Sequence, residues 1–190
     1  LLNVDLRNFS RMAATIGPQK TVSALNSFFS TMGEIVFAHQ GIVAKYLGDG
    51  FLALFGAPVA TISDADNAIS AAIEMKKALT DLNADLKENM DLTLHIGISI
   101  HTGEVVVGNI GFDKKMDYTV IGDAVNSVFN IQDLTRQMPD VILISEKTMK
   151  SLRYSVKVNE IDISEENTKV EGLKVFELIS QTRTDHDHSP

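Results

Sequence analysis

Two aspartates stand within apolar runs that are typical of β-strands. Asp5 lies in LLNVDLRNFS at 1–10, and Asp49 lies in KYLGDGFLALFGAP at 45–58. An ionised carboxylate in an apolar segment is costly to bury unless a cation compensates it, and oxygen ligands suit divalent ions. Two carboxylates that converge on Mg²⁺ indicate phosphoryl or nucleotidyl transfer. The alternative is that both aspartates only cap turns at strand ends.

The elements around these aspartates must bring them together. The expected elements are a strand over 1–6, a helix that starts near Pro18 and is ended by Gly41, strands over 42–46 and 51–55 around the turn at 47–50, a helix capped by Ser63 or Asp64 that runs to about 89, and a strand over 92–100. This order is that of a ferredoxin-like βαββαβ core. It places Asp5 on the first strand and Asp49 at the hairpin turn.

Beyond residue 100 the sequence predicts additional strands and helices. These are a strand over 105–110, a helix opened by Gly122, a strand over 141–144 with a short helix after it, and strands within 154–178 around a polar loop at 163–169. The expected fold class is therefore α+β. One catalytic domain is expected over 1–180, followed by a polar tail over 181–190.

The composition excludes several classes of protein. The chain has 190 residues, of which 44% are hydrophobic and 22% charged, and its net charge is −8. An acidic surface argues against nucleic-acid binding and against a basic membrane-docking face. The absence of cysteine excludes disulfides and thiolate metal sites and fits a reducing cytosol, so a cytoplasmic location is expected.

The ends of the chain also carry expectations. No apolar run reaches the roughly 18 residues that predict a membrane-spanning helix, and no signal peptide precedes the first strand. Because the chain begins almost on a strand, we expect an upstream sensor or regulatory domain that is not part of this sequence.

Three segments carry a family resemblance. They are VDLRNFS at 4–10, KYLGDGFLALFGAP at 45–58 and HTGEVVVGNIGFDKKMDYTVIGDAVN at 101–126. In these segments, their order and their spacing, the chain resembles the catalytic domain of class III nucleotidyl cyclases, the adenylate/guanylate cyclase family, in its bacterial form. The resemblance extends from Leu1 to about Leu178.

The resemblance implies a reaction and a metal site. The reaction is conversion of ATP to 3′,5′-cyclic AMP and pyrophosphate with two Mg²⁺ or Mn²⁺ ions per site. Asp5, Asp49 and the carbonyl of Leu6 are the implied metal ligands. The implied phosphate-binding positions are Asn8, Phe9 and Ser10, together with Gly48 in the hairpin turn. The family often has glycine where Asn8 stands, and asparagine tolerates the positive φ that such a turn needs.

The resemblance also assigns residues that read the base and the ribose. Lys45 and Thr119 match the base-selecting positions, and this pair favours adenine, since guanylate cyclases tend to have glutamate in place of the lysine. The alternative for Lys45 is an edge-strand lysine with its amine in water. Asn126 matches the ribose-orienting asparagine, rather than a solvent-facing helix residue. Asp123 is interpreted as a helix N-terminal charge, not a ligand.

Two positions depart from the family pattern. Asn130 stands where the family usually has the arginine that contacts the α-phosphate, although it retains a place among the catalytic residues with Asp5, Asp49 and Asn126. Glu171 stands where a triphosphate-binding lysine is common. Lys169 and Lys174 are out of register, and Arg136 would need a bend in the helix to substitute for Asn130. Each lost donor of this kind can cost about 10²–10³-fold in rate.

Three functions follow from these observations. The favoured one is an ATP-specific cyclase that works as a homodimer, in which Asp5 and Asp49 come from one subunit and Lys45, Thr119 and Asn126 from the other. The second is a degenerate cyclase-homology domain that binds nucleotide or only dimerises. The third, a diguanylate cyclase, is disfavoured because GDGF at 48–51 lacks the glutamate of that signature.

Overall fold

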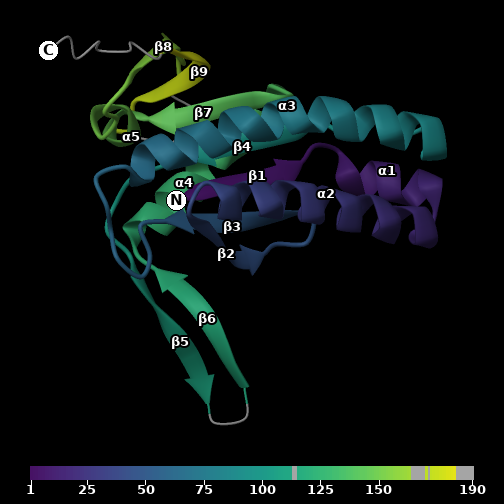
Figure 1. Cartoon of the computed structure of the whole chain (residues 1–190), viewed down its shortest axis with the longest axis horizontal. Helices are drawn as coiled ribbons and strands as arrows, with labels where there is room; N and C mark the ends of the chain where they lie inside the picture. The colour runs from purple at the N-terminus through teal and green to yellow at the C-terminus, as the bar shows by residue number, and fades with distance from the viewer. Residues whose placement is uncertain (113–114, 164–169, 171, 183–190) are drawn as a thin grey trace, which may run out of the picture.

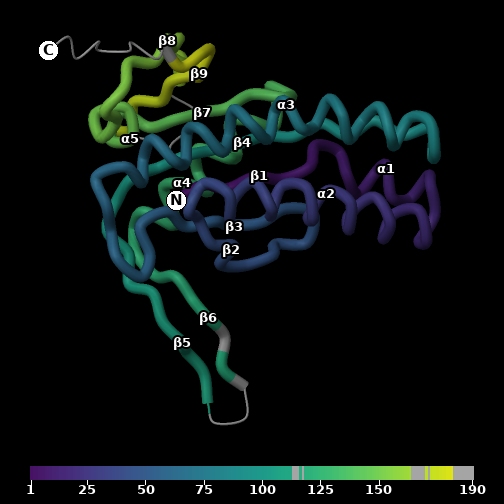
Figure 2. Tube along the Cα trace, in the orientation of Figure 1, coloured from purple at the N-terminus to yellow at the C-terminus, as the bar shows by residue number. Residues whose placement is uncertain are grey.

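The computed structural model describes residues 1–112, 115–163, 170 and 172–182 of the chain. A mixed β-sheet forms the body of the protein, helices cover it, and one β-hairpin projects from it (Figure 1). The Cα trace shows that the start of the chain lies in the middle of this body (Figure 2).

The first seven elements form the predicted ferredoxin-like core. They are β1 (Leu2–Leu6), α1 (Phe9–Ile16), α2 (Pro18–Ala38), β2 (Gly41–Tyr46), β3 (Gly50–Phe55), α3 (Asp64–Met90) and β4 (Ile96–Ile100). Their strands lie in the order β2-β3-β1-β4, and all neighbours are antiparallel. The predicted fold class is confirmed.

The C-terminal elements extend this sheet and cover it. They are α4 (Asp123–Leu134), the short 3₁₀ helix η1 (Thr135–Gln137), β7 (Val141–Ser145), α5 (Glu146–Lys150), β8 (Ser155–Glu160) and β9 (Val175–Thr182). β7 pairs in parallel with β4, and β9 and β8 continue the sheet antiparallel. The additional strands and helices were expected, but their pairing was not.

A separate two-stranded sheet is formed by β5 (Val106–Phe112) and β6 (Lys115–Ile121). The hairpin points away from the main sheet (Figure 1). The sequence predicted a strand near β5 but none over 115–121. Strand prediction relies on alternating burial, and most described side chains of this hairpin lie outside the core, so that signal is missing here.

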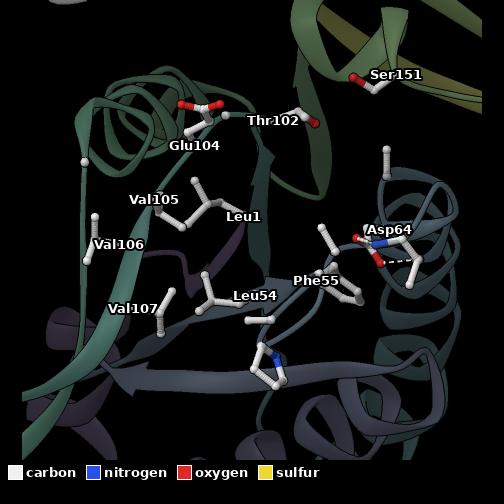
Figure 3. Close-up of a pocket in the computed structure, with 18 of the residues that line it drawn as sticks. Leu1, Leu54, Phe55, Asp64, Thr102, Glu104, Val105, Val106, Val107 and Ser151 are labelled. Carbon is white, nitrogen blue, oxygen red and sulfur yellow. Dashed lines mark hydrogen bonds between the residues drawn. The ribbon is translucent and has the colours of Figure 1, made fainter.

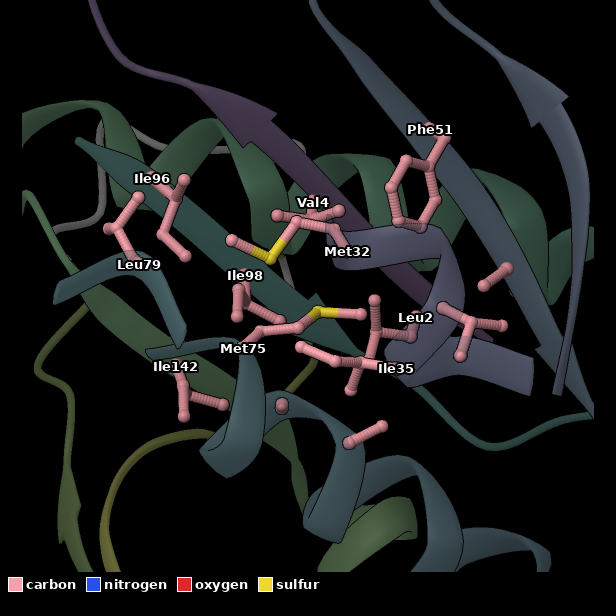
Figure 4. Packing of buried hydrophobic residues seen from close by; sticks show 14 of the residues in the cluster. Leu2, Val4, Met32, Ile35, Phe51, Met75, Leu79, Ile96, Ile98 and Ile142 are labelled. Carbon is pink, nitrogen blue, oxygen red and sulfur yellow. The ribbon is translucent and has the colours of Figure 1, made fainter. Parts of the chain in front are cut away.

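The alternation of side chains along β1 separates two faces of the sheet. Leu2, Val4 and Leu6 are buried beneath α2 and α3, in the main hydrophobic core. Figure 4 shows Leu2 and Val4 among the side chains of this core. Asn3 and Asp5 alternate with these residues and therefore point to the opposite face, where α4 packs on β1, β4 and β7.

Several boundaries differ from those expected. The helix α2 ends at Ala38, before Gly41, because Gln40 adopts a φ of 62° that the helix cannot continue. β4 begins at Ile96 and not at Leu92. The apolar residues before it are buried in an irregular segment. The side chain of Asn83 on α3 holds this segment through hydrogen bonds with both the amide and the carbonyl of Leu94.

The helix starts follow the predicted residues with one change in detail. Pro18 is at the first turn of α2, and Gly122 precedes α4. Ser63 is the N-cap of α3, but its side chain makes no capping hydrogen bond. The carboxylate of Asp64 instead accepts hydrogen bonds from the amide and the hydroxyl of Thr61.

Two expectations fall wholly or largely on residues that the structure leaves undescribed. The predicted loop at 163–169 lies outside the described residues except for residue 163, and the predicted tail at 181–190 does so except for residues 181 and 182. Among the helices that the structure describes, none is both long enough and apolar enough to cross a bilayer.

Candidate active site

The backbone brings Asp5 and Asp49 to the same end of the sheet. Asp5 is the partner of Gly50 on β3 and of Gly97 on β4. The amide of Leu6 donates a hydrogen bond of 3.0 Å to the carbonyl of Asp49. The β2–β3 turn is therefore fixed against the end of β1, as the hairpin prediction requires.

Two glycines shape this turn. Gly48 has a φ of 79°, which L-residues other than asparagine and aspartate rarely adopt. An added Cβ at Gly50 would lie 2.6 Å from the Cβ of Asp5, so Gly50 leaves the space that the Asp5 side chain occupies.

The donor set at Asp5 fits a divalent cation. Its Oδ1 atom is buried, and the group beside it is the cationic guanidinium of Arg7. Within these residues no group of three or more His, Cys, Asp or Glu side chains could hold a metal ion. A site made of two carboxylates and the Leu6 carbonyl suits Mg²⁺, which commonly takes one or two carboxylates and completes its shell with substrate phosphates and water.

Arg7 is a functional candidate that the sequence analysis did not consider. One of its guanidinium nitrogens, Nη2, forms an ion pair with Oδ1 of Asp5. Burial lowers the pKa of Arg7, and the positive charge of Arg136 lowers this pKa further, whereas Asp49 and Asp133 raise it. The available signal was a charged residue two positions after Asp5, in the turn that directly follows β1.

The turn after β1 has the conformation that was expected of Asn8. This residue is the N-cap of α1, with φ 56° and ψ 23° in the left-handed region, and its carbonyl accepts a hydrogen bond of 3.1 Å from Met12. Phe9 and Ser10 form the first turn of α1, where backbone amides lack helical acceptors. The structure thus places the three predicted phosphate-binding residues at a helix N-terminus, directly after the strand that carries Asp5.

Lys45 and Thr119 lie on elements that contact each other. Lys45 is exposed on β2, the edge strand, next to an irregularity in the β2–β3 pairing. Thr119 is half-buried on β6 opposite Gly108, and β2 contacts β6. Because edge exposure also fits the alternative for Lys45, the base-selecting role stays a prediction.

The residues predicted on α4 share one helix. Asn126 is exposed one turn into α4, and Asn130 is half-buried one turn further along the same face. Asp123 is exposed in the first turn, which fits its interpretation as a helix N-terminal charge. α4 ends at Leu134, and Arg136 forms an ion pair of 3.0 Å with Asp133.

The second departure from the family pattern cannot be placed. Glu171 and Lys169 both lie outside the described residues. Lys174 is exposed, and its carbonyl accepts a hydrogen bond of 2.9 Å from the amide of Glu146.

A sequence profile decides the family. The profile described as "Adenylate and Guanylate cyclase catalytic domain" matches residues 1–180. The chain belongs to this family. The resemblance carried by the three motifs is therefore confirmed, and the protein contains an adenylate/guanylate cyclase catalytic domain.

Named relatives of this cyclase domain include two bacterial enzymes. An adenylate cyclase of Anabaena cylindrica is 33% identical over 94% of this chain and 36% of its own length. Adenylate cyclase 1 of Rhizobium meliloti is 25% identical over 94% of this chain and 27% of its own length. The chain thus spans about a third of the length of these relatives.

Solved structures of both substrate classes resemble this cyclase domain. The guanylyl cyclase Cya2 superposes with a TM-score of 0.84 at 32% identity and covers 97% of this chain and 93% of its own. The adenylyl cyclase CyaB from P. aeruginosa has a TM-score of 0.81 at 25% identity and covers 96% and 93%. These similarities leave the choice between ATP and GTP to the residues of the site.

A cavity of the cyclase domain lies elsewhere. It has a volume of about 920 Å³ and is lined by the start of β1, the segment after β3 and the base of the β5–β6 hairpin. Figure 3 shows Leu1, Leu54, Val105 and Asp64 around it. None of the predicted site residues lines this cavity.

The β5–β6 hairpin of the cyclase domain exposes apolar side chains. They are Val106, Ile110, Phe112, Met116, Tyr118 and Ile121, each between 41% and 69% exposed. Facing pairs in the hairpin put Val106 and Ile121 on the same side as Thr119. An apolar patch of this kind next to a predicted substrate-binding residue is typical of a surface that another protein chain covers.

Proposed function

We propose that this domain is an adenylate cyclase that converts ATP to 3′,5′-cyclic AMP and pyrophosphate, and that residues 1–180 form its catalytic domain. The observation that carries this proposal is the hydrogen bond from the Leu6 amide to the Asp49 carbonyl, which holds two carboxylates at one sheet end. The directly adjacent N-terminus of α1 supplies backbone donors for a polyphosphate.

The residues of the site have distinct tasks. Asp5, Asp49 and the Leu6 carbonyl would hold two Mg²⁺ or Mn²⁺ ions. When bound, the ions supply Lewis-acid chemistry, which activates the ribose 3′-hydroxyl and neutralises phosphate charge. The amides after Asn8 bind and orient the phosphates. Asn126 orients the ribose so that its 3′-hydroxyl is in line with the α-phosphorus.

Lys45 and Thr119 support adenine over guanine. A lysine can only donate, and adenine presents an acceptor nitrogen where guanine presents a donor. A threonine hydroxyl can accept a hydrogen bond from the amino group of adenine.

A homodimer with shared sites completes the proposal. Asp5 and Asp49 of one subunit would face Lys45, Thr119 and Asn126 of the other. The exposed apolar hairpin supports a second copy as its cover, because burying such side chains drives association.

A second candidate function is a degenerate cyclase domain that binds nucleotide or dimerises with little turnover. The observation that favours it is Asn130, because an amide brings no positive charge to the developing negative charge of the transition state.

The experiment that separates the two candidates is a product assay. Purified protein is incubated with ATP or GTP in the presence of Mg²⁺ or Mn²⁺, and the cyclic nucleotides are quantified. The proposal predicts metal-dependent cyclic AMP in clear excess over cyclic GMP. A dimeric protein that binds ATP but forms neither product would support the degenerate domain instead.

The shared-site dimer has its own test. An Asp49→Asn chain and a Lys45→Ala chain should each be nearly inactive alone. When mixed, they should recover activity, since one of the two sites in a mixed dimer retains all its residues. Absence of recovery at concentrations where mixed dimers are demonstrated would contradict shared sites.

A further inference from the structure

Arg7 lies directly beside the first proposed metal ligand. It follows Asp5 by two residues, in the turn directly after β1. Nη2 of Arg7 and Oδ1 of Asp5 form an ion pair, in which the Arg7 side chain is 7% exposed and the Asp5 side chain 29%. A guanidinium this buried beside a metal-ligand carboxylate needs an explanation.

The neighbouring elements leave a space for this guanidinium. A Cβ added at Gly97 would lie 3.1 Å from Cζ of Arg7 and 2.8 Å from the Cβ of Thr135. The Nε atom of Arg7 is buried and has no hydrogen-bond partner in the described parts of the chain. Arg7 is therefore not held by a full set of hydrogen bonds. The ion pair with Asp5 and the nearby negative charges of Asp49 and Asp133 compensate its burial.

Stability alone accounts poorly for this pair. Taking two charges out of water costs about as much as their attraction returns, so apolar replacements of buried pairs are often neutral or stabilising. In this chain the pair also occupies the buried oxygen of Asp5 that a divalent cation would use. A role connected to the cation accounts for both the place and the partner of Arg7.

We propose that Arg7 is a positioning residue that holds Asp5 as an internal counter-ion and keeps the affinity of the nucleotide-free site for divalent cations low. This inference rests on the proposed metal-ligand role of Asp5. With Arg7 present, the two carboxylates and the guanidinium carry one net negative charge instead of two. A cation that binds Oδ1 of Asp5 must displace the guanidinium or share the carboxylate with it, and both lower its affinity.

The consequence is coupling between metal and nucleotide. Arg7 offsets one negative charge of the empty site, and a bound triphosphate adds negative charge back. The site therefore binds the cation tightly only when the nucleotide is also bound. Such a site avoids a tightly bound metal in the absence of substrate. Without Arg7 the empty site attracts the cation more strongly, because Coulomb interactions across a few ångströms are substantial in a partly buried site.

The test measures binding of Mn²⁺ alone, without nucleotide, by the electron paramagnetic resonance signal of free Mn²⁺. Arg7→Met and Arg7→Gln should bind Mn²⁺ at least about tenfold more tightly than the wild-type protein. Arg7→Lys retains the charge and should stay within about threefold of wild type. Arg136→Met is the matched control: it removes a charge from the same cluster, but that side chain is 73% exposed and paired with Asp133.

A second measurement, the change in Tm on addition of Mn²⁺, remains informative if a variant is less stable than the wild type. Both neutral variants should gain more in Tm from added Mn²⁺ than the wild type does, because ligand binding to the native state stabilises it in proportion to affinity. Neutral variants that bind Mn²⁺ no more tightly than wild type would overturn the role of Arg7. If Asp5→Asn binds Mn²⁺ as well as wild type does, the metal site itself is wrong, and that outcome is distinct from a failure of Arg7 alone.

Discussion

Gly50 and Asp5 are direct partners across the β1–β3 pair, and an added Cβ at Gly50 would lie 2.6 Å from the Cβ of Asp5. Because Gly50 has no side chain, the side chain of Asp5, the proposed metal ligand, can occupy the space beside it. The turn that carries Asp49 is joined to the same end of β1, because the Leu6 amide donates a hydrogen bond to the Asp49 carbonyl.

Gly50→Ala should therefore affect both stability and activity. The added methyl group must displace Asp5 or the backbone of β1, and overpacking of this kind costs about 1–3 kcal/mol of unfolding free energy. Cyclase activity should fall at least about tenfold, since a misplaced ligand shifts the reacting groups. Urea unfolding and a cyclic AMP assay measure the two effects.

Gly33→Ala is the matched control. A Cβ there meets no atom within 4 Å outside its own helix, so the change should raise stability by about 0.5–1 kcal/mol through helix propensity. If Gly50→Ala behaves like Gly33→Ala in both measurements, the close approach to Asp5 has no functional meaning.

Lys45→Glu should change the ratio of ATP to GTP turnover. A carboxylate repels the acceptor nitrogen of adenine and accepts from the donor of guanine, so the ratio of kcat/KM values should fall at least about tenfold, near the loss of one charged hydrogen bond. Lys157→Glu makes the same charge change on β8, the opposite edge strand, and should leave the ratio as it was. An equal effect of both variants would point to bulk charge instead of base recognition.

Asn130→Arg should raise kcat. Asn130 is one turn beyond Asn126 on the same face of α4, where in the proposed site a positive charge would act on the α-phosphate as negative charge develops. We expect kcat to rise by at least about tenfold with a much smaller change in KM for ATP. Gln137→Arg, exposed and beyond the end of α4, controls for added charge. An unchanged kcat in a folded dimer would favour the degenerate domain.

His101 connects pH to stability. It is 2% exposed, and its Nδ1 lies 2.9 Å from the hydroxyl of Ser145. Burial, followed by the positive charges of Lys147 and the amino terminus, lowers the pKa of His101 from 6.5 to about 4. Because the native state resists protonation that the unfolded state accepts, this contribution is complete above about pH 6.5 and is lost as the pH falls toward 4.

Urea unfolding near pH 7.5 and near pH 5 tests this account. The wild type should lose about 2 kcal/mol more unfolding free energy between these conditions than His101→Gln does. His39→Gln removes a half-buried histidine that pairs with Glu74 and should behave like the wild type. A His101→Gln variant with the wild-type loss would show that another group carries the acid sensitivity.

Sequence reasoning predicted what depends on local pattern. Apolar residues at alternate positions of β1 identified a buried strand, and the Gly48–Gly50 turn identified a hairpin, so the juxtaposition of Asp5 and Asp49 follows from the order of local elements alone. The left-handed conformation of Asn8 followed from the family resemblance, in which glycine is common at this position, and asparagine tolerates the positive φ.

The features that sequence reasoning missed depend on contacts between distant segments. The strand β6 packs against β5 outside the main sheet, so burial imposes no pattern on it. The parallel pairing of β4 with β7 joins residues more than forty positions apart. From the sequence, Arg7 is only a charged residue in a turn. Its place beside Asp5 depends on the space that it shares with Gly97 and Thr135, which are distant in the sequence.

The measurement that tests the central claim most directly is metal-dependent formation of cyclic AMP from ATP by wild-type protein, Asp49→Asn and Asp81→Asn. Asp81 is an exposed aspartate of α3 and controls for the loss of one carboxylate. The account predicts that Asp49→Asn loses at least about a hundredfold in rate while it stays folded, and that Asp81→Asn retains wild-type activity. Wild-type rates in Asp49→Asn would contradict the two-carboxylate site.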